Sequence, residues 1–322
     1  ENSKLFLILC GSSLSFMEEQ VLGYQSPLYG RRTSQYKIKP FSFFETCDYY
    51  KTFSYEEKAL IYGLTSGIPL YLSLFREDKS LKQNIIDIFL SSNGYLFEEP
   101  TNLIKQECRD PSTYNSIIQA IALGATKLSE ISNQVGIETG LCTTYIKKLI
   151  SLGIIIKDTP IYKPSKKQTI YLLADHMFQF WYKFVLPNIS LINMGMGDRV
   201  YKKIEPHFYE FMGYIFEDIC KQYLWLLNIH EELPLFFLKL GRWWGNDTRI
   251  KAEAEIDIVA YNDENQILIG ECKWRNEDTD KKVLDKTIFR SELFSFLNKY
   301  IYLFSKSRFS SYCLEYAKNN PS

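Results

Sequence analysis

A run of consecutive apolar residues, Leu5–Cys10, stands near the start of the chain and stops at a Gly-Ser-Ser turn. Such a run is typical of a strand buried in the middle of a parallel sheet. A second strand is predicted at Gln35–Lys39, where Pro40 ends it. Two strands cannot make a stable α/β domain alone. We therefore expect residues 1–50 to be the last strands of an α/β domain whose other strands precede this sequence.

Helical spacing of apolar residues follows over residues 51–110. Pro69 is favoured in the first turn of a helix, and with Gly67 it separates the first two segments. The predicted helices are Glu56–Leu64, Pro69–Phe75, Ser80–Ser91 and Phe97–Cys108.

Residues 111–173 predict three short helices and a hairpin, which is the pattern of a winged helix-turn-helix. Glycines at the helix ends fit C-terminal caps. The predicted helices are Tyr114–Leu123, Lys127–Val135 and Glu138–Leu152, closed by Gly124, Gly136 and Gly153, and the strands are Ile154–Lys157 and Thr169–Leu173.

Residues 174–322 form the last predicted unit, which mixes helices and strands. Glu205–Leu227 carries an apolar stripe at helical spacing. The remaining predictions are an aromatic-rich segment at His176–Val185, strands at Ala254–Tyr261 and Gln266–Lys273, and a helix near Phe289–Asn298.

Composition indicates an ordinary folded protein with several cores, since 46% of the 322 residues are hydrophobic and 24% are charged. The formal net charge is zero, so any nucleic-acid signal must come from local patches. Seven cysteines without a C-x-x-C pair favour free thiols in a reducing cytoplasm. Neither a signal peptide nor a membrane span is predicted. The three histidines lack metal-ligand spacing and are predicted to be structural.

The predicted winged helix is locally basic, with seven lysines against three carboxylates in residues 112–170. Lysines on a recognition helix and on a wing are placed to meet phosphates, which predicts DNA as a partner. The alternative is a solvated face that contacts neighbouring domains or another protein. The candidate DNA-binding residues are Thr143, Thr144, Lys147 and Lys148 on the helix and Lys163, Lys166 and Lys167 on the wing.

A set of carboxylates and one lysine carries the sharpest chemical signal. Residues two apart in a strand share a face, so Glu255 and Asp257 are predicted to point one way, with Ile256 and Ile258 opposite. By the same rule Glu271 and Lys273 share a face, with Cys272 opposite. The polar turn at residues 262–265 allows a hairpin that brings Asp257 beside Glu271.

Clustered carboxylates repel unless a cation neutralises them, and oxygen ligands suit Mg²⁺. We expect Asp257, Glu271 and Glu217, from the preceding helix, to hold Mg²⁺ or Mn²⁺. Lys273 completes the predicted catalytic set, and Glu255 is expected to stand one step behind the metal ligands. The alternative is an ordinary charged sheet face, or the inactive descendant of a nuclease.

Several blocks, in their order along the chain, resemble the archaeal-type ATPases of the STAND branch of the P-loop ATPases. They are Leu5–Ser13, Pro27–Arg32, Lys39–Phe43 and the Gly-x-Pro motif Gly67–Pro69. Four later blocks resemble the C-terminal domain of that family, which is related to restriction-endonuclease-like nucleases of the PD-(D/E)xK type. They are Gly213–Glu217, Gly241–Trp244, Glu255–Val259 and Glu271–Trp274.

The resemblance implies a multidomain α+β and α/β protein. Its parts would be a partial ATPase α/β domain (1–50), a helical lid (51–110), a winged helix (111–173) and a restriction-endonuclease-like α/β/α domain (174–322). It also implies a remnant of the nucleotide site at Ser12, Ser13, Arg31, Arg32, Gly67 and Pro69. The Gly-x-x-x-x-Gly-Lys-[Ser/Thr] loop is absent from these residues. ATP binding is therefore expected only if an upstream ATPase portion supplies that loop.

Two functions of different classes follow. The first is a metal-dependent nuclease with a DNA-binding winged helix. The second is a non-catalytic module that binds partners for an ATP-driven switch, or a truncated gene product that cannot bind ATP by itself. The expected partners are DNA, an upstream ATPase portion or a second copy of the chain, and not a membrane.

Overall fold

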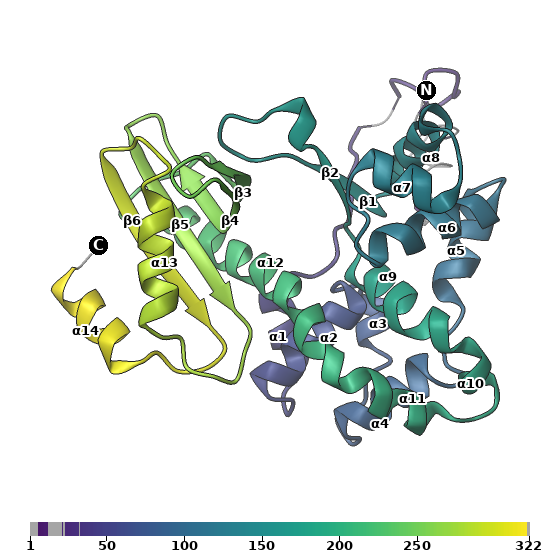
Figure 1. Cartoon of the computed structure of the whole chain (residues 1–322). Helices are drawn as coiled ribbons and strands as arrows, with labels where there is room; N and C mark the ends of the chain where they lie inside the picture. The colour runs from purple at the N-terminus through teal and green to yellow at the C-terminus, as the bar shows by residue number, and fades with distance from the viewer. Residues whose placement is uncertain (1–5, 12–20, 22, 32, 321–322) are drawn as a thin grey trace.

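The computed structural model describes residues 6–11, 21, 23–31 and 33–320, with Lys166 described by its backbone alone. Helices gather on one side of the molecule, and a four-stranded sheet forms the other (Figure 1). The long helix α12 runs between the two parts (Figure 1). The fold is therefore a mixed α and β arrangement with two separate sheets.

The elements of the helical side are α1 Phe43–Tyr49, α2 Tyr55–Thr65, α3 Pro69–Leu72, α4 Leu81–Phe89, α5 Glu99–Glu107, α6 Pro111–Ala122, α7 Leu128–Val135, α8 Thr139–Ser151, β1 Ile155–Asp158, β2 Ile170–Leu173, α9 His176–Phe180, α10 Ile189–Asn193 and α11 Gly197–Ile204. The elements that follow are α12 Phe208–Ile229, β3 Lys239–Asp247, β4 Ala252–Tyr261, β5 Gln266–Lys273, α13 Lys281–Ser291, β6 Asn298–Ser305 and α14 Ser311–Asn319.

Capping explains where the first helices begin. Ser54 accepts a hydrogen bond from the Glu57 amide, and the Glu57 carboxylate accepts one from the Ser54 amide, which closes the start of α2. Ser42 and Glu45 form the same pair at α1, a helix that the apolar pattern did not predict. The Ser-x-x-Glu spacing was the sequence signal for it.

The helices predicted between residues 51 and 152 are present, with bounds that differ by a few residues. α6, α7 and α8 are followed by the antiparallel pair β1–β2, whose register runs from Ile155↔Leu173 to Asp158↔Ile170. Gly136 and Gly153 adopt positive φ after their helices, as expected for glycine caps. Three helices and a hairpin therefore stand in the predicted order.

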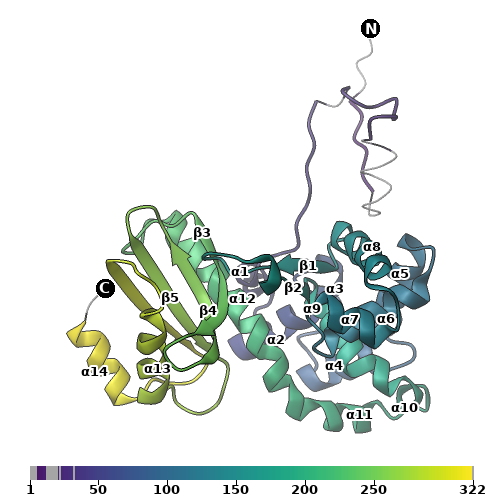
Figure 2. The same cartoon turned by 45° about the horizontal axis from the view of Figure 1, so that its top comes forward.

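The two strands predicted before Pro40 are wrong. Residues 6–10 and 35–39 carry no strand assignment, and residues 33–39 run as an exposed segment that stands away from the helices (Figure 2). Phe6 and Ile38 are among the exposed large apolar residues. A strand needs neighbours to pair its peptide groups, and no strand of the described chain pairs with either segment.

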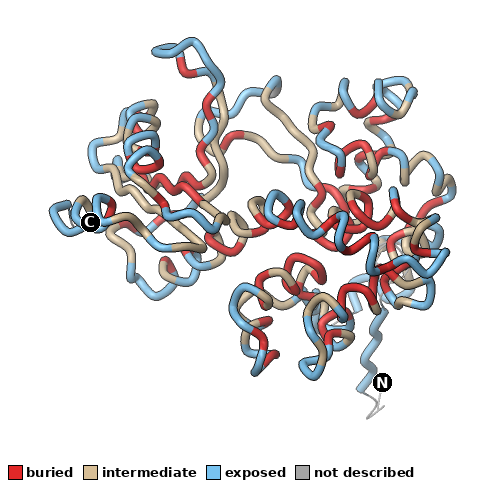
Figure 3. Tube along the Cα trace, turned by 60° about the horizontal axis from the view of Figure 1, so that its bottom comes forward, coloured by how far each residue is buried: buried red, intermediate tan, exposed pale blue. Residues whose placement is uncertain are grey.

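The larger sheet has the order β3-β4-β5-β6, antiparallel across the first three strands and parallel between β5 and β6. α13 connects the two parallel strands. Leu268 and Cys272 of β5 pack with Cys220 and Leu224 of α12. On the opposite face Ile267 and Ile269 pack with Phe294, which follows α13. The buried stretches accordingly run along the strands and through the middle of the helical side, whereas outward loops are exposed (Figure 3).

The helix predicted near Phe289–Asn298 is also wrong. α13 ends at Ser291, and β6 begins at Asn298. The apolar residues between them pack from a loop, where Phe294 is only 1% exposed. Their spacing reflects contact with the sheet rather than a helical period.

A β-bulge in β4 overturns the predicted alternation of Ile256 and Ile258. The register with β3 shifts between the pairs Gly241↔Val259 and Trp243↔Ile256, so β4 carries one extra residue at this point. Ile256 therefore packs with Val259 on the α13 face, whereas Ile258 packs on the α12 face. Asp257 lies within the bulge.

The tip of the β1–β2 hairpin docks on the outer strand β3 (Figure 1). The Ile161 amide donates to the Arg242 carbonyl at 2.9 Å, and the Gln168 side chain donates to the Trp244 carbonyl at 2.8 Å. In return the Trp244 indole donates to the Gln168 carbonyl at 3.1 Å. The hairpin thus joins the helical side to the sheet.

Two further findings concern the whole described chain. None of its helices combines the length and the apolar character needed to cross a bilayer. All seven cysteines are free.

Candidate active site

Lys273 bridges two carboxylates at the end of the β4–β5 hairpin away from its turn. Its ammonium lies 2.6 Å from Glu271 Oε1 and 4.0 Å from Asp257 Oδ2. One cation in reach of both oxygens means that both carboxylates converge on the same spot. The sequence prediction that brings Asp257, Glu271 and Lys273 together agrees with this geometry.

Asp257 lies just beyond the point where the pairing of β4 with β5 ends. The backbone register of β4 and β5 reaches Ile258↔Gly270, and beyond it Asp257 Oδ2 accepts a hydrogen bond of 2.8 Å from the Cys272 amide. The carboxylate thus accepts from a backbone amide of β5 that lies beyond the last paired residue of β4 and β5. This contact fixes the position of one of its oxygens beside β5.

Glu271 is 5% exposed, and burial raises its pKa. The negative charge of Asp257 raises that pKa further, whereas Lys273 and, more weakly, Arg290 of α13 lower it. Arg290 lies 3.6 Å from Glu271 Oε2, an oxygen that has no hydrogen-bond partner within the described chain. A buried acceptor without a donor favours a cation at this place.

Glu217 of α12 belongs to a neighbouring charge group. Its Oε2 lies 3.2 Å from Arg242 Nε and 3.8 Å from Lys221 Nζ, and Arg242 also pairs with Glu255. Burial raises the pKa of Glu217 to about 7, against the lowering by Arg242, and the charge of Asp257 adds to the rise. Glu255 contacts Arg242 rather than standing behind Asp257 and Glu271.

The three carboxylates predicted to share a metal are not gathered into one ligand group. Within the described ranges, no three His, Cys, Asp or Glu side chains lie together so as to hold a metal ion. Asp257 and Glu271 still suit Mg²⁺, which commonly takes one or two protein carboxylates and completes its shell with water and substrate phosphate. Glu271 Oε2, which is buried and has no hydrogen-bond partner in the described chain, is the observation that supports this fit.

Glu217→Gln should remove a pH dependence of stability. The folded-state pKa of about 7 lies above the ordinary glutamate pKa of 4.5, so folding takes up a proton between these two pH values. The ionisable Glu217 therefore lowers the free energy of unfolding, and this loss increases as the pH rises through this window. We expect the variant to gain about 2–3 kcal/mol on the wild type between pH 4.5 and pH 8, measured by urea unfolding across pH. Parallel stability curves for the two proteins would contradict the burial of an ionisable Glu217.

The candidate DNA-binding residues differ in how far their side chains are exposed. Lys147 is exposed on α8, as are Lys163 and Lys167 on the hairpin tip. Lys148 is half-buried. The hydroxyls of Thr143 and Thr144 donate to carbonyls of their own helix, at 2.9 and 3.4 Å. The side chain of Lys166 lies outside the described atoms.

The residues of the predicted nucleotide-site remnant are only partly described. Ser12, Ser13 and Arg32 lie outside the described residues, and Arg31 and Pro69 are exposed. Gly67 has a structural task, since its carbonyl accepts from the Phe41 amide and a Cβ would stand 2.0 Å from the Phe41 carbonyl oxygen. Pro69 begins α3, as its position in the sequence predicted.

Sequence reasoning missed Arg242 and Arg290. Arg242 lies opposite the bulge of β4, and only the register between two strands shows that. Arg290 lies in a helix whose bounds the apolar pattern misplaced. Arg242 falls in the block Gly241–Trp244 that carried the family resemblance, but that block gave Arg242 no role, and Arg290 carried no signal.

Fold and site together define a mixed α and β protein with two sheets and a half-buried carboxylate–lysine cluster. Residues 181–284, which include Glu217, Asp257, Glu271 and Lys273, match the DUF234 family, described as archaea bacterial proteins of unknown function. The chain is 36% identical over 309 residues to the uncharacterized protein MJECL04 of Methanocaldococcus jannaschii, a match that covers 93% of this chain and 67% of that protein. The chain belongs to the family of that archaeal protein.

A solved structure, the Walker-type ATPase PABY2304 of Pyrococcus abyssi, matches with a TM-score of 0.36 and 20% sequence identity. The match covers 53% of this chain and 48% of that chain, so this chain spans about half of the ATPase. A likeness at this TM-score carries no argument about fold or function.

Proposed function

We propose that this chain is a metal-dependent nuclease that hydrolyses phosphodiester bonds in DNA. The single observation that carries the proposal is the convergence of Asp257 and Glu271 on the Lys273 ammonium, at 4.0 and 2.6 Å. Two carboxylates and one lysine at the end of a hairpin supply the charges that phosphate hydrolysis needs. The layers of α12, sheet and α13 agree with the α/β/α architecture that the sequence resemblance implies.

A Mg²⁺ or Mn²⁺ ion held by Asp257 and Glu271 would supply Lewis acidity and lower the pKa of bound water. Lys273 stabilises the negative charge that develops on the phosphate oxygens. The hydrogen bond that the Cys272 amide donates keeps Asp257 in place, and Arg290 faces the second oxygen of Glu271. Arg242 holds Glu217 beside this group, so Glu217 is a positioning residue in this proposal.

The substrate class rests on the basic surface of the three helices and hairpin. Lys147 is exposed on α8, and Lys163 and Lys167 are exposed on the docked hairpin tip. The tip meets β3 at Arg242, whose side chain contacts Glu217. Phosphates bound along this surface would therefore lead toward the sheet that carries Asp257.

The test is cleavage of single-stranded and double-stranded DNA by the full chain with Mg²⁺ or Mn²⁺. We expect nicking or fragmentation that a chelator stops. Intact DNA under every metal condition, from a protein shown to be folded, would contradict the proposal.

A second candidate is a regulatory module that binds partners for an ATP-driven switch. The observation that favours it is Arg242, which neutralises Glu217 and Glu255 with protein charges alone. In that case the chain should bind DNA or a partner but cleave nothing, and ATP binding would depend on an upstream ATPase portion.

Replacing both Lys147 and Lys167 by Ala should weaken DNA binding at every sequence and lower its salt dependence. Each lysine that meets a phosphate contributes close to one unit to the slope of log K against log salt. Fluorescence anisotropy with labelled duplexes at several salt concentrations measures both quantities. Lys282→Ala, an exposed change on α13, is the matched control. Unchanged affinity at low salt would make the basic surface a protein contact instead.

A further inference from the structure

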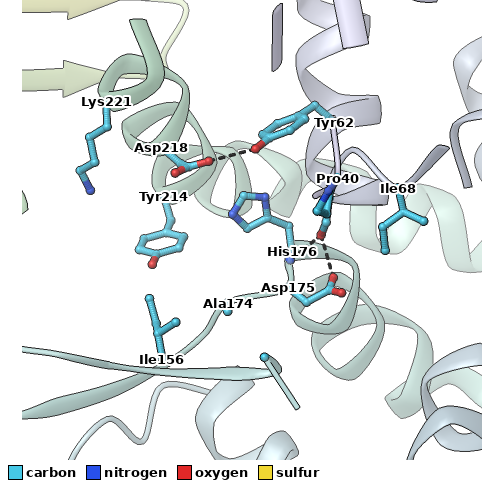
Figure 4. A pocket seen from close by; sticks show the side chains of 12 residues that line it. Pro40, Tyr62, Ile68, Ile156, Ala174, Asp175, His176, Tyr214, Asp218 and Lys221 are labelled. Carbon is cyan, nitrogen blue, oxygen red and sulfur yellow. Dashed lines mark hydrogen bonds between the residues drawn. The ribbon is translucent and has the colours of Figure 1, made fainter. Parts of the chain in front are cut away.

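A pocket of about 340 Å³ lies where α2, the start of α9 and α12 meet, with the β1 end of the hairpin beside it (Figure 4). Its polar lining comes from Tyr62, Asp175, His176, Tyr214, Asp218 and Lys221. The apolar wall includes Ile68 and Ile156. We call this space the α2–α9–α12 pocket. It is distinct from the cluster of Asp257, Glu271 and Lys273, none of which lines it.

His176 gives the first sign of a ligand. The residue is 6% exposed, and its Nδ1 has no hydrogen-bond partner in the described part of the chain. Its ring stands edge-on to Tyr62 and Tyr214, with centroids at 5.8 and 6.2 Å. Burial lowers the pKa of His176, so the ring is neutral and offers one acceptor nitrogen. A buried polar atom without a partner, in a residue that lines a pocket, points to a group bound beside it.

The two carboxylates give the second sign. Asp218 Oδ2 accepts from Tyr62 at 3.1 Å and from Gln222 at 2.8 Å, and Asp175 Oδ1 accepts from Ser66 at 2.7 Å. These bonds orient both side chains, but none of the donors is a cation. Lys221 is the cation of the lining, and its ammonium lies 3.8 Å from Glu217. Asp175 Oδ1 also accepts from the Met177 and Phe178 amides at the start of α9, and burial raises the pKa of Asp175. Asp218 is therefore the carboxylate of the pocket whose charge has no paired cation among the described residues.

The sign of that charge decides the ligand class. The unpaired charge of Asp218, together with the pairing of Lys221 with Glu217, disfavours an anion such as phosphate. An organic cation gains from the charge of Asp218 and from the oxygens of Asp175. Its N–H groups also suit the acceptors of Asp218 and His176, which a quaternary ammonium ion would not satisfy.

We propose that the α2–α9–α12 pocket binds a small organic cation that carries N–H donors, of the size of an alkyl diamine. Tyr62, His176 and Tyr214 enclose its chain, and Asp175 and Asp218 receive its ammonium groups. Asp218 and Lys221 lie within about one turn of Glu217 on the same helix, so the ligand binds close to the charge group of Glu217 and Arg242.

Calorimetric titration of the full chain with putrescine in 150 mM NaCl tests the proposal without DNA or metal. We expect saturable binding that a Asp218→Asn change weakens by about tenfold or more, since Asn keeps an acceptor for Tyr62 and Gln222 but loses the charge. His176→Phe keeps the ring between the two tyrosines and removes both nitrogens, and it should weaken binding to a similar extent. Asp263→Asn, in the exposed β4–β5 turn, is the control and should bind as the wild type does.

Tetramethylammonium and inorganic phosphate are the comparison ligands. We expect neither to displace putrescine, because the first lacks N–H donors and the second carries the wrong charge. Displacement by phosphate would overturn the charge argument, and equal binding of tetramethylammonium would overturn the role of the acceptors. Absence of putrescine binding, or equal binding by Asp218→Asn, would overturn the proposal as a whole.

Discussion

Lys273→Ala is expected to lower metal-dependent DNA cleavage by at least about a hundredfold while metal binding stays nearly intact. The ammonium of Lys273 touches Glu271 and faces Asp257, so it stands where a phosphate bound to those carboxylates would carry its charge. Alanine removes this charge but leaves both carboxylates and the Asp257 bond to the Cys272 amide.

Single-turnover cleavage of a labelled duplex measures this effect, with Mn²⁺ titrated into the same variant. Lys282→Ala is the matched control, since Lys282 is exposed in the first turn of α13. This variant should cleave DNA as the wild type does. Cleavage by Lys273→Ala at the wild-type rate would remove Lys273 from the catalytic set. Loss of metal binding in that variant would show that the lysine supports the fold of the cluster instead.

Tyr162→Ala should cost about 2–3 kcal/mol of unfolding free energy and release the hairpin tip from the sheet. The Tyr162 ring packs against Tyr261, Phe294 and Phe296, with centroids at 5.6, 5.5 and 5.5 Å. This aromatic cluster lies beside the Ile161 bond to the Arg242 carbonyl. Its loss should free β3 from its contact with the helical side.

Hydrogen exchange and urea unfolding measure the two parts of this effect. Amides of β3 and of the hairpin tip should exchange faster in Tyr162→Ala, with little change in α2 or α6. Lys167→Ala is the control, because Lys167 is an exposed residue of the same tip. Unchanged exchange in β3 would mean that the docked tip contributes little to holding the sheet.

Periodicity predicted the parts of the fold that depend on local pattern. The bounds of β5 are those expected, Gln266–Lys273, and the hairpin with β4 follows from the polar turn between them. The helices of residues 111–152 were recognisable from apolar spacing and from glycines at their ends. These elements are specified by residues close together in the chain.

The wrong predictions of strands, alternation and helix bounds arose where contacts between residues distant in the sequence decide the local structure. Leu5–Cys10 and Gln35–Lys39 have strand composition, but no described strand pairs with them. The bulge at Asp257 depends on the register with β3, which the sequence of β4 does not contain. The residues after α13 are apolar because Phe294 fills the sheet face, and their spacing imitated a helix.

The candidate site divides in the same way. Asp257, Glu271 and Lys273 could be brought together from strand alternation and one turn, because they lie on adjacent strands. Glu217 could not be placed, since Arg242 reaches it from β3 and draws it into a separate ion pair. The docking of the hairpin on β3 likewise left no mark in the sequence.

Metal binding by Asp257 and Glu271 is the central claim, and Mn²⁺ titration of the wild type and Asp257→Asn tests it most directly. Asparagine keeps an oxygen for the Cys272 amide, so the local fold should survive while the charge is lost. Asp263→Asn in the exposed turn is the matched control. We predict saturable Mn²⁺ binding near one ion per chain in the wild type and the control, and none in Asp257→Asn. Equal binding by Asp257→Asn, or no binding by the wild type, would contradict the account.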